Sequence, residues 1–505
     1  MASPDGWDFI VVGGGTAGCV VAARLSQEDR ARVLLLEAGS RQPMEAAPSA
    51  WTGLQGTSAD WAGMSVVQGA TGTTIPWPRG RGLGGSSAIN GMVFLRGHHS
   101  SYDAWVTAGA EGWGFDDLLP YLRRCEHAEG RDPAIRGVGG PLIVDPVTSP
   151  HPLAEAALAA AAEVGYRAAA DIGSGLEEGF GLADLNIVDG KRQSAADAYL
   201  VPVLDRPNLT VVTGALVHRL RVERGRCTGL EYSVGAEMVT ASAAQTILTA
   251  GTVGSPQLLL LSGIGPQQHL RDVGISVVLD LPGVGENLHD HPRSTIVYGA
   301  SRPIAIADSN HAEVAGLIRS EFAHDGPDLQ FQALEIPYYA ATLPPVLPAE
   351  GQGYTIAFSA MAPRSRGSIR LFDADPESAP RLDPNYYGDH RDLDVMAAGL
   401  RVARAIGNAA ALDLWRDEEV LPGPGVRADD AVRTYLHRSL RTYSHQVGTC
   451  RMGTDAMAVV DTGLRVRGLE GLRVADASVM PSLVSANPVA AVYAIAERAA
   501  ALIHD

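Results

Sequence analysis

Short apolar runs separated by glycine-rich turns form the main pattern of the first part of the chain. Phe9–Val12 is an apolar run short enough for one buried strand, and Val33–Leu36 is a second such run. Between them, residues 13–18 read Gly-Gly-Gly-Thr-Ala-Gly, and the segment that follows has helical spacing. The positions expected to pack this helix are Val20, Val21, Ala23 and Leu25. The pattern predicts a strand, a tight turn, a helix and a second strand in succession.

The turn fits the pattern G-x-G-x-x-G, in which each glycine has a physical role. Gly13 permits the tight turn, Gly15 lets the backbone approach a pyrophosphate, and Gly18 lets the helix pack against the strand. Glu37 follows about 20 residues later, where a carboxylate accepts a hydrogen bond from a ribose 2′-hydroxyl and disfavours a 2′-phosphate. The unit therefore predicts a bound adenine dinucleotide, and a purely structural turn is the alternative.

The pattern of a short apolar strand, a turn and a helix returns twice further along the chain. Thr246–Ala250 is a short buried strand that runs into a glycine turn, with a helix expected over Leu258–Ser262. Near the end, Leu472–Ser478 reads as a strand that ends in polar residues, and Val489–Ile503 as a closing helix. If this last strand rejoins the first sheet, the nucleotide-binding domain is discontinuous and another domain is inserted in it.

The middle of the chain has a different pattern. Alternating strands are expected over Gln330–Ile336 and Tyr354–Ala360, followed by long helices. We interpret this part as a separate antiparallel sheet with helices that covers the nucleotide domain. The predicted domains are residues 1–150, 190–297 and 443–505 for nucleotide binding, and residues 151–189 and 298–442 for substrate binding. Other expected elements are helices over Asp116–Glu126, Pro152–Val164, Leu393–Ile406 and Ala428–Leu440, and strand patterns over Ala195–Leu204, Leu209–Val212 and Leu216–Val222.

Charge and composition exclude several classes of function. The 505 residues carry a net charge of -17, which argues against nucleic acid or an anionic membrane surface as a partner. No apolar run reaches the roughly 20 residues that a membrane helix needs, and the N-terminus lacks a signal core, so we expect a soluble, cytoplasmic protein. The four cysteines are scattered, which indicates buried reduced thiols and no metal site.

Three further features are candidates for chemistry. The glycine-dense stretch Arg79–Gly91 implies backbone in close contact with another group. His445 is either a catalytic base or a histidine whose hydrogen bonds are satisfied in the core. Asn487 precedes Pro488, and an Asn followed by a Pro is common at the start of a helix. A helix cap is therefore the alternative to a role in the site.

Taken in order, the glycine turn, the Arg79–Gly91 loop, the Gly251–Gly265 turn and the late His and Asn resemble the glucose–methanol–choline oxidoreductase family. The likeness covers essentially the whole chain, and the two loops resemble the two family signatures. It implies an α/β protein in which a discontinuous, Rossmann-like FAD-binding domain carries an inserted α+β substrate domain built on an antiparallel sheet. FAD would lie extended, with its flavin beneath the inserted domain.

The resemblance also assigns roles to residues. The opening glycines and Glu37 would hold the ADP half, Val217 would contact adenine through its backbone, and Asn90–Val93 would lie along the flavin. The expected cofactor contacts are Gly13, Gly15, Thr16, Ala17, Gly18, Glu37, Ala38, Arg81, Gly84, Gly85, Ser86, Asn90, Gly91, Met92, Val93, Val217, Ala250, Asp476, Ala477, Asn487 and Pro488. The family attaches FAD covalently in some members through a histidine at the position of Ile89, so a dissociable, non-covalent flavin is expected here.

The implied reaction is the oxidation of an alcohol to an aldehyde. His445 would take the hydroxyl proton, hydride would pass to flavin N5, and Asn487 would donate to the developing alkoxide. The alternatives are a flavin-containing lyase or decarboxylase on the same scaffold, and a non-catalytic dinucleotide-binding protein. The substrate would be a primary alcohol, aromatic or aliphatic, or a hydrated aldehyde. Choline is disfavoured because no cation cage is visible, and oxygen or another acceptor would reoxidise the flavin. Tyr338, Tyr339 and Phe358 either line the pocket or pack in the core.

Overall fold

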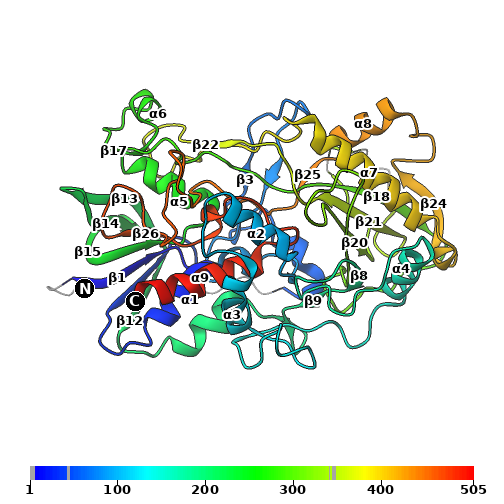
Figure 1. The fold of residues 1–505 in the computed structure, drawn as a ribbon, viewed down its shortest axis with the longest axis horizontal. Helices are drawn as coiled ribbons and strands as arrows, with labels where there is room; N and C mark the ends of the chain where they lie inside the picture. Colours follow the sequence, from blue (N-terminus) through cyan, green and yellow to red (C-terminus); the bar gives the residue numbers. More distant parts are fainter. Residues whose placement is uncertain (1–5, 42–45, 341, 344–347, 505) are drawn as a thin grey trace.

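The computed structural model describes residues 6–41, 46–340, 342–343 and 348–504. Two sheets, each with its own helices, lie side by side along the long axis of the molecule (Figure 1). The first and last elements, β1 (Trp7–Val12) and α9 (Val489–His504), both lie with the first sheet. The prediction of a mixed α/β fold is confirmed.

The first sheet has a parallel core. Its strand order is β12 (Leu209–Thr213), β2 (Val33–Glu37), β1 (Trp7–Val12), β15 (Glu237–Leu248) and β26 (Leu472–Val474), and each neighbouring pair is parallel. All five side chains of β2 are buried, as parallel strands covered on both faces require. The far end of β15 continues as an antiparallel meander with β14 (Arg226–Val234) and β13 (Ala215–Glu223).

Helices from both ends of the chain cover this sheet. α1 (Thr16–Leu25) connects β1 to β2 and packs on α9 (Val489–His504), which also packs on α3 (Phe115–Cys125). Because β26 pairs with β15, the last segment does rejoin the first sheet. The exact domain boundaries stay a prediction, and the pairing of β18 with β21 from Arg293 onward extends the second sheet a few residues earlier than residue 298.

The second sheet is antiparallel throughout. Its order is β24 (Arg416–Leu421), β18 (Pro292–Ala300), β21 (Gly353–Ala360), β20 (Leu329–Leu334), β19 (Val314–Ile318) and β8 (Gly179–Leu182), and β25 (Arg441–Thr442) also pairs with β18. One face packs on α7 (His390–Gly407) and α4 (Pro152–Glu163), with Phe331 and Phe358 in that core. Alternation places Gln330 and Gln332 on the other face, which is turned toward the first domain's site residues.

Two expected elements differ in the structure. Ala195–Leu204 is not a strand: it forms a π-helical turn, Ala196–Leu200, and a 3-10 turn, Val201–Val203. The reason is a capping box, because Ser194 Oγ accepts from Asp197 N while Asp197 Oδ2 accepts from Ser194 N at 2.8 Å.

The helix after β15 begins earlier than expected. α5 spans Gly251–Leu261, not Leu258–Ser262, although Pro256 lies inside it. Pro256 cannot donate to the carbonyl of Thr252, and Thr449 Oγ1 donates to that carbonyl instead at 2.6 Å. A hydroxyl from a distant segment thus allows the helix to include the proline.

The remaining elements are short. They are α2 (His99–Thr107), α6 (Gln267–Asp272), α8 (Asp429–Arg438), β3 (Gly63–Met64), β4 (Pro76–Trp77), β5 (Val93–Phe94), β6 (Glu126–His127), β7 (Leu142–Ile143), β9 (Asp184–Leu185), β10 (Ile187–Val188), β11 (Lys191–Arg192), β16 (Ile264–Gly265), β17 (Leu279–Asp280), β22 (Ser368–Arg370), β23 (Arg381–Asp383) and the 3-10 turns Pro48–Leu54, Gly85–Ala88, Ala410–Leu412 and Ala477–Val479. None of the described helices is long and apolar enough to cross a bilayer.

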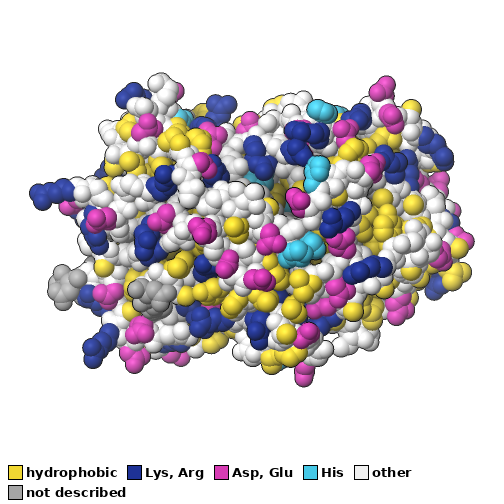
Figure 2. All heavy atoms as spheres, in the orientation of Figure 1, with side chains coloured by type: hydrophobic (Ala, Val, Ile, Leu, Met, Phe, Trp, Pro, Cys, Tyr) yellow, Lys and Arg dark blue, Asp and Glu magenta, His cyan; other side chains and the backbone are white. Residues whose placement is uncertain are grey.

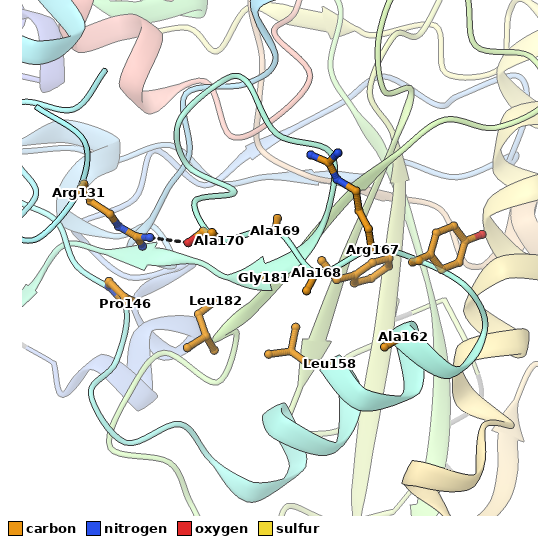
Figure 3. A pocket seen from close by; sticks show the side chains of 12 residues that line it. Arg131, Pro146, Leu158, Ala162, Arg167, Ala168, Ala169, Ala170, Gly181 and Leu182 are labelled. Atoms are coloured by element: carbon orange, nitrogen blue, oxygen red, sulfur yellow. Dashed lines mark hydrogen bonds between the residues drawn. The ribbon is translucent and has the colours of Figure 1, made fainter. Parts of the chain in front are cut away.

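The surface gives little direct sign of a site. Basic and acidic side chains are interspersed over the face shown in Figure 2. A hollow of about 250 Å³ opens beside α4 and β8, lined mainly by short aliphatic side chains, and Arg131 donates to the carbonyl of Ala170 at its rim (Figure 3). It contains none of the predicted site residues.

Candidate active site

The glycine turn is built as its spacing predicts. Gly13 has a φ of +102°, and a Cβ on Gly18 would lie 1.8 Å from the carbonyl oxygen of Gly13. α1 begins at Thr16; its N-terminus has no side-chain cap and no acidic residue in the first turn, as far as the described chain goes. Free backbone N–H groups and the positive end of the helix dipole are therefore available to an anion such as a pyrophosphate.

The Arg79–Gly91 loop packs directly on this turn. Gly84 N donates to Gly14 O at 2.8 Å, and a Cβ on Gly85 would lie 2.6 Å from Gly15 Cα. Gly15 itself has more room, since within the described residues a Cβ there would meet only Gly85 Cα, at 3.8 Å. The two loops thus form a cradle at Gly15 that fits the close approach of a dinucleotide phosphate.

Glu37 lies beside the cradle and is buried. Its carboxylate accepts from Gly14 N at 2.8 Å, Gly39 N at 2.7 Å and Gly82 N at 3.0 Å. Burial raises the pKa of Glu37, and the three backbone donors and Arg81 oppose that rise. A carboxylate has about four acceptor positions, so one remains for a ribose hydroxyl.

Asp476 joins two elements in the middle of the expected cofactor path. It accepts from Gly251 N at 2.9 Å and Ser255 Oγ at 2.5 Å, at the start of α5, and from Ser478 N at 2.8 Å. Its side chain is therefore engaged within the protein, next to Ala250 and Ala477. A contact from this residue to a cofactor would use its backbone.

The loop expected along the flavin is held by residues that the sequence analysis missed. Asn90 Oδ1 accepts from Met92 N at 2.9 Å and from Arg192 Nη1 at 2.7 Å. Met92 has a φ of +60°, a conformation that a non-glycine residue rarely adopts. Arg192 comes from β11, and no motif in its own sequence indicated this contact. Val217 lies in β13, which contacts β2, and Val93 lies in β5.

His445 lies where the two sheets meet. Its backbone N–H donates to Asp290 Oδ1 at 2.8 Å, just before β18, and Thr252 Oγ1 donates to the neighbouring Gln446 carbonyl at 2.6 Å. The imidazole is 6% exposed. The structure therefore places His445 beside the start of α5, the helix that follows β15. β15 is the neighbour of β1, the strand that precedes the glycine turn.

A chain of hydrogen bonds determines which nitrogen of His445 carries the proton. His291 Nε2 lies 3.1 Å from Met361 O, a carbonyl that only accepts, so this nitrogen is the donor. Neutral His291 then accepts at Nδ1, and the Nδ1 of His445, 2.9 Å away, must donate to it. The Nε2 of His445 is left with its lone pair, 3.1 Å from Asn487 Nδ2.

Burial keeps both imidazoles neutral. It holds the pKa of His445 well below 6.5, with smaller contributions from His291 and from the Arg293 guanidinium. Burial also lowers the pKa of His291 to about 3. A neutral imidazole with a free lone pair at Nε2 is the form that a general base needs.

Asn487 does not cap the closing helix. α9 begins at Val489, and the first carbonyl to accept a helical bond is that of Pro488, from Val492 N at 3.0 Å. The oxygen of Asn487 accepts instead from Gln330 Nε2 at 3.1 Å, which turns its NH₂ group toward His445. The alternative explanation of Asn487 as a helix cap was wrong, because Gln330 from the second sheet binds its side-chain oxygen.

The expected pocket residues divide between the two faces of the second sheet. Phe358 packs in the α7 core and is 1% exposed, so it lies away from His445. Tyr338 is half-buried near Trp51, with ring centroids 6.2 Å apart. Tyr443 was not predicted, and its ring stacks on that of His445 at 4.0 Å. In the described residues, no three His, Cys, Asp or Glu side chains form a metal-binding group.

Known proteins resemble this chain over nearly its whole length. Residues 7–293 and 363–496 match two family models, both described as GMC oxidoreductase. The alcohol dehydrogenase (acceptor) of Pseudomonas putida is 37% identical over 529 aligned positions, which cover 98% of this chain and 95% of that protein. The mitochondrial choline dehydrogenase of Homo sapiens is 37% identical over 538 positions, covering 99% of this chain and 90% of that protein. The crystal structure of pyridoxine 4-oxidase from Mesorbium loti superposes with a TM-score of 0.94 at 38% identity and 99% coverage of both chains.

Proposed function

Because this chain belongs to the GMC oxidoreductase family, FAD-dependent enzymes that act on CH–OH donors, we propose that His445 removes the hydroxyl proton of an alcohol. One observation carries the proposal: the unprotonated Nε2 of His445 and the Nδ2 of Asn487 lie 3.1 Å apart, so one substrate oxygen can contact both. His291, which accepts from Nδ1, is the positioning residue that keeps Nε2 free.

The geometry suits a hydroxyl group placed between these two side chains. Such a hydroxyl donates to Nε2 of His445 and accepts from Nδ2 of Asn487, replacing their direct hydrogen bond. As the proton moves to Nε2, negative charge develops on the substrate oxygen, and the Asn487 donor stabilises it. Gln330 holds the Asn487 amide in the orientation that this requires.

The cofactor would be held by the cradle at Gly15, by Glu37 and by the loop at Asn90. When bound, FAD supplies the acceptor for the hydride that leaves the carbinol carbon. We propose that it binds without a covalent link, because Ile89, buried among Leu54 and Ala59, offers no nucleophile. Acid precipitation should leave all yellow colour in the supernatant; colour that stays with the pellet would contradict non-covalent binding.

The alternative functions, a lyase, a decarboxylase and a non-catalytic binding protein, have less support. None of the relatives described above is a lyase or a decarboxylase, and a non-catalytic binder would not need a neutral base aligned with an amide donor. Although choline dehydrogenases are among the relatives, we propose a non-cationic alcohol here, because the Arg293 guanidinium lies beside the site. The electron acceptor and a cytoplasmic location stay predictions.

Anaerobic mixing of the FAD-bound protein with a panel of primary alcohols tests the proposal. Bleaching of the flavin with formation of aldehyde is the expected result. Product formed without bleaching would show lyase chemistry, and neither change with any alcohol would show a binding protein.

A further inference from the structure

Two arginines lie directly opposite each other at the edge of the second sheet, next to the proposed base. Arg293 of β18 pairs in register with Arg441 of β25. Like charges directly opposite in neighbouring strands are destabilising, so this pairing needs a compensating feature.

The described protein residues do not supply that compensation. No carboxylate lies within 4.0 Å of either guanidinium in the ion pairs of the described chain. Arg293 Nη2 donates to the neutral Gln332 Oε1 at 2.8 Å, and Arg441 donates to Tyr338 Oη at 2.9 Å and to the carbonyl of Tyr339. Arg293 is only 5% exposed, and a buried charge without an opposite partner is strongly unfavourable in a protein interior.

The acid that comes just before β18, Asp290, is occupied elsewhere. Asp290 accepts from Tyr386 Oη at 2.5 Å, from Thr442 Oγ1 and from the backbone N–H of His445. Its hydrogen bonds therefore stabilise the His445 segment and leave both guanidinium groups without an anion.

Aromatic rings place this positive pair beside the reacting end of the site. The Arg441 and Arg293 guanidinium groups lie 4.0 and 5.1 Å from the ring centroid of Tyr338, and Arg293 lies 4.4 Å from that of Tyr443. Tyr443 in turn stacks on His445 at 4.0 Å. One aromatic ring therefore separates the buried guanidinium from the proposed base.

Tyr443 adds an unused donor. Its hydroxyl is buried beside the Asn487 side chain and makes no hydrogen bond of ordinary geometry in the described chain. A buried hydroxyl without such a bond is costly unless a ligand binds it, and so it points independently to a polar group that completes this site.

We propose that Arg293 and Arg441 form an anion subsite that binds a carboxylate on the alcohol substrate. The substrate class is then a primary alcohol with a carboxylate about one aromatic ring away from its hydroxymethyl group. Guanidinium groups bind carboxylates through paired, charge-assisted hydrogen bonds, which gives both affinity and orientation. This inference rests on the proposed function for the hydroxymethyl end.

Binding to the FAD-loaded protein tests the subsite without turnover. Calorimetric titration with benzoate and with benzamide compares an anion with its neutral isostere. We expect benzoate to bind at least about 10-fold more tightly, and this preference to be lost in R293Q and in R441Q but retained in R30Q, a change at an exposed arginine. Equal affinity for the two probes in the unmodified protein would overturn the inference, whether or not the variants fold.

Turnover separates this inference from the proposed function. The ratio of kcat/KM for 4-(hydroxymethyl)benzoate over 4-(hydroxymethyl)benzamide should fall about 10- to 100-fold in R293Q, with partial recovery in R293K. If the benzoate preference is present but no alcohol bleaches the flavin, the subsite stands and the proposed function fails. If alcohols bleach the flavin but the carboxylate gives no advantage, the subsite fails alone.

Discussion

At the residue scale, His445 owes its assigned role to a bond on the side of the ring that faces away from the substrate. His291 accepts from Nδ1 because its own Nε2 is committed to the Met361 carbonyl. The proton is thereby kept off Nε2, where the lone pair is needed. Burial then keeps the ring neutral.

Replacing His291 tests this positioning role. In H291F the Nδ1 of His445 loses its acceptor, so the ring can adopt the other tautomer, and we expect kcat for flavin reduction to fall about 10-fold or more with FAD content unchanged. H291N, whose amide oxygen can accept the same bond, should recover part of the rate. The exposed His324→Phe is the matched control. A rate in H291F equal to that of the control would show that His291 does not position the base.

How far the residues of the site could be predicted depended on how far apart their partners lie in the chain. His445 and Asn487 were found by resemblance to a family, since each has an ordinary structural explanation in its local sequence. His291 and Gln330 were missed because each acts across more than 150 residues of chain, and no local pattern reports such a contact. For the same reason a helix cap stayed the alternative explanation for Asn487, although Gln330 holds its oxygen.

At the scale of elements, two glycines of one turn have opposite tolerance to a side chain. Gly18 has no room, because its Cβ would overlap the Gly13 carbonyl, whereas Gly15 has ordinary contact distances in the protein alone. The strand–turn–helix unit was predictable because the spacing G-x-G-x-x-G places a glycine at each of these two positions. The residues of the capping box at Ser194 were also present in the sequence, but the apolar pattern after them predicted a strand.

The pair G15A and G18A separates folding from cofactor binding. G15A should fold and lose FAD affinity about 10-fold or more, because a methyl group would occupy the space needed for the phosphate. G18A should not accumulate as folded protein, because α1 could not pack against β1. Circular dichroism and flavin titration measure the two effects. Full FAD affinity in G15A would mean that the phosphate does not approach this glycine.

At the scale of the whole molecule, the first sheet offers the cradle and the second sheet supplies the polar face above the base. The junction is made by chain that enters β18 directly after Asp290 and His291, so both domains contribute to one centre. The parallel and antiparallel sheets followed from the hydrophobic pattern. The residue contacts between the two sheets did not, because they depend on packing between distant surfaces.

The second domain also carries a buried acid that affects overall stability. Both oxygens of Glu335 are buried without partners in the described chain, and burial, with a smaller effect of Glu313, raises its pKa to about 8. Between pH 4.5 and 8 the unfolded chain is ionised at this position while the folded protein stays protonated. The free energy of unfolding therefore falls as pH rises through this window.

Glu335→Gln removes that titration. The variant should match the parent protein in stability at pH 5 and exceed it by about 3 to 5 kcal/mol at pH 8, which thermal or urea unfolding at both pH values can measure. The exposed Glu418→Gln serves as the control and should change neither value. A stability difference that is the same at both pH values would contradict the assignment.

The central claim is that His445 takes the hydroxyl proton of the alcohol that reduces the flavin. The most direct measurement is the anaerobic rate of flavin bleaching by a primary alcohol in H445Q, compared with the parent protein at equal FAD content. Loss of a general base predicts a fall of about 10²- to 10⁴-fold with the flavin still bound. Bleaching at the parent rate in H445Q would contradict the account.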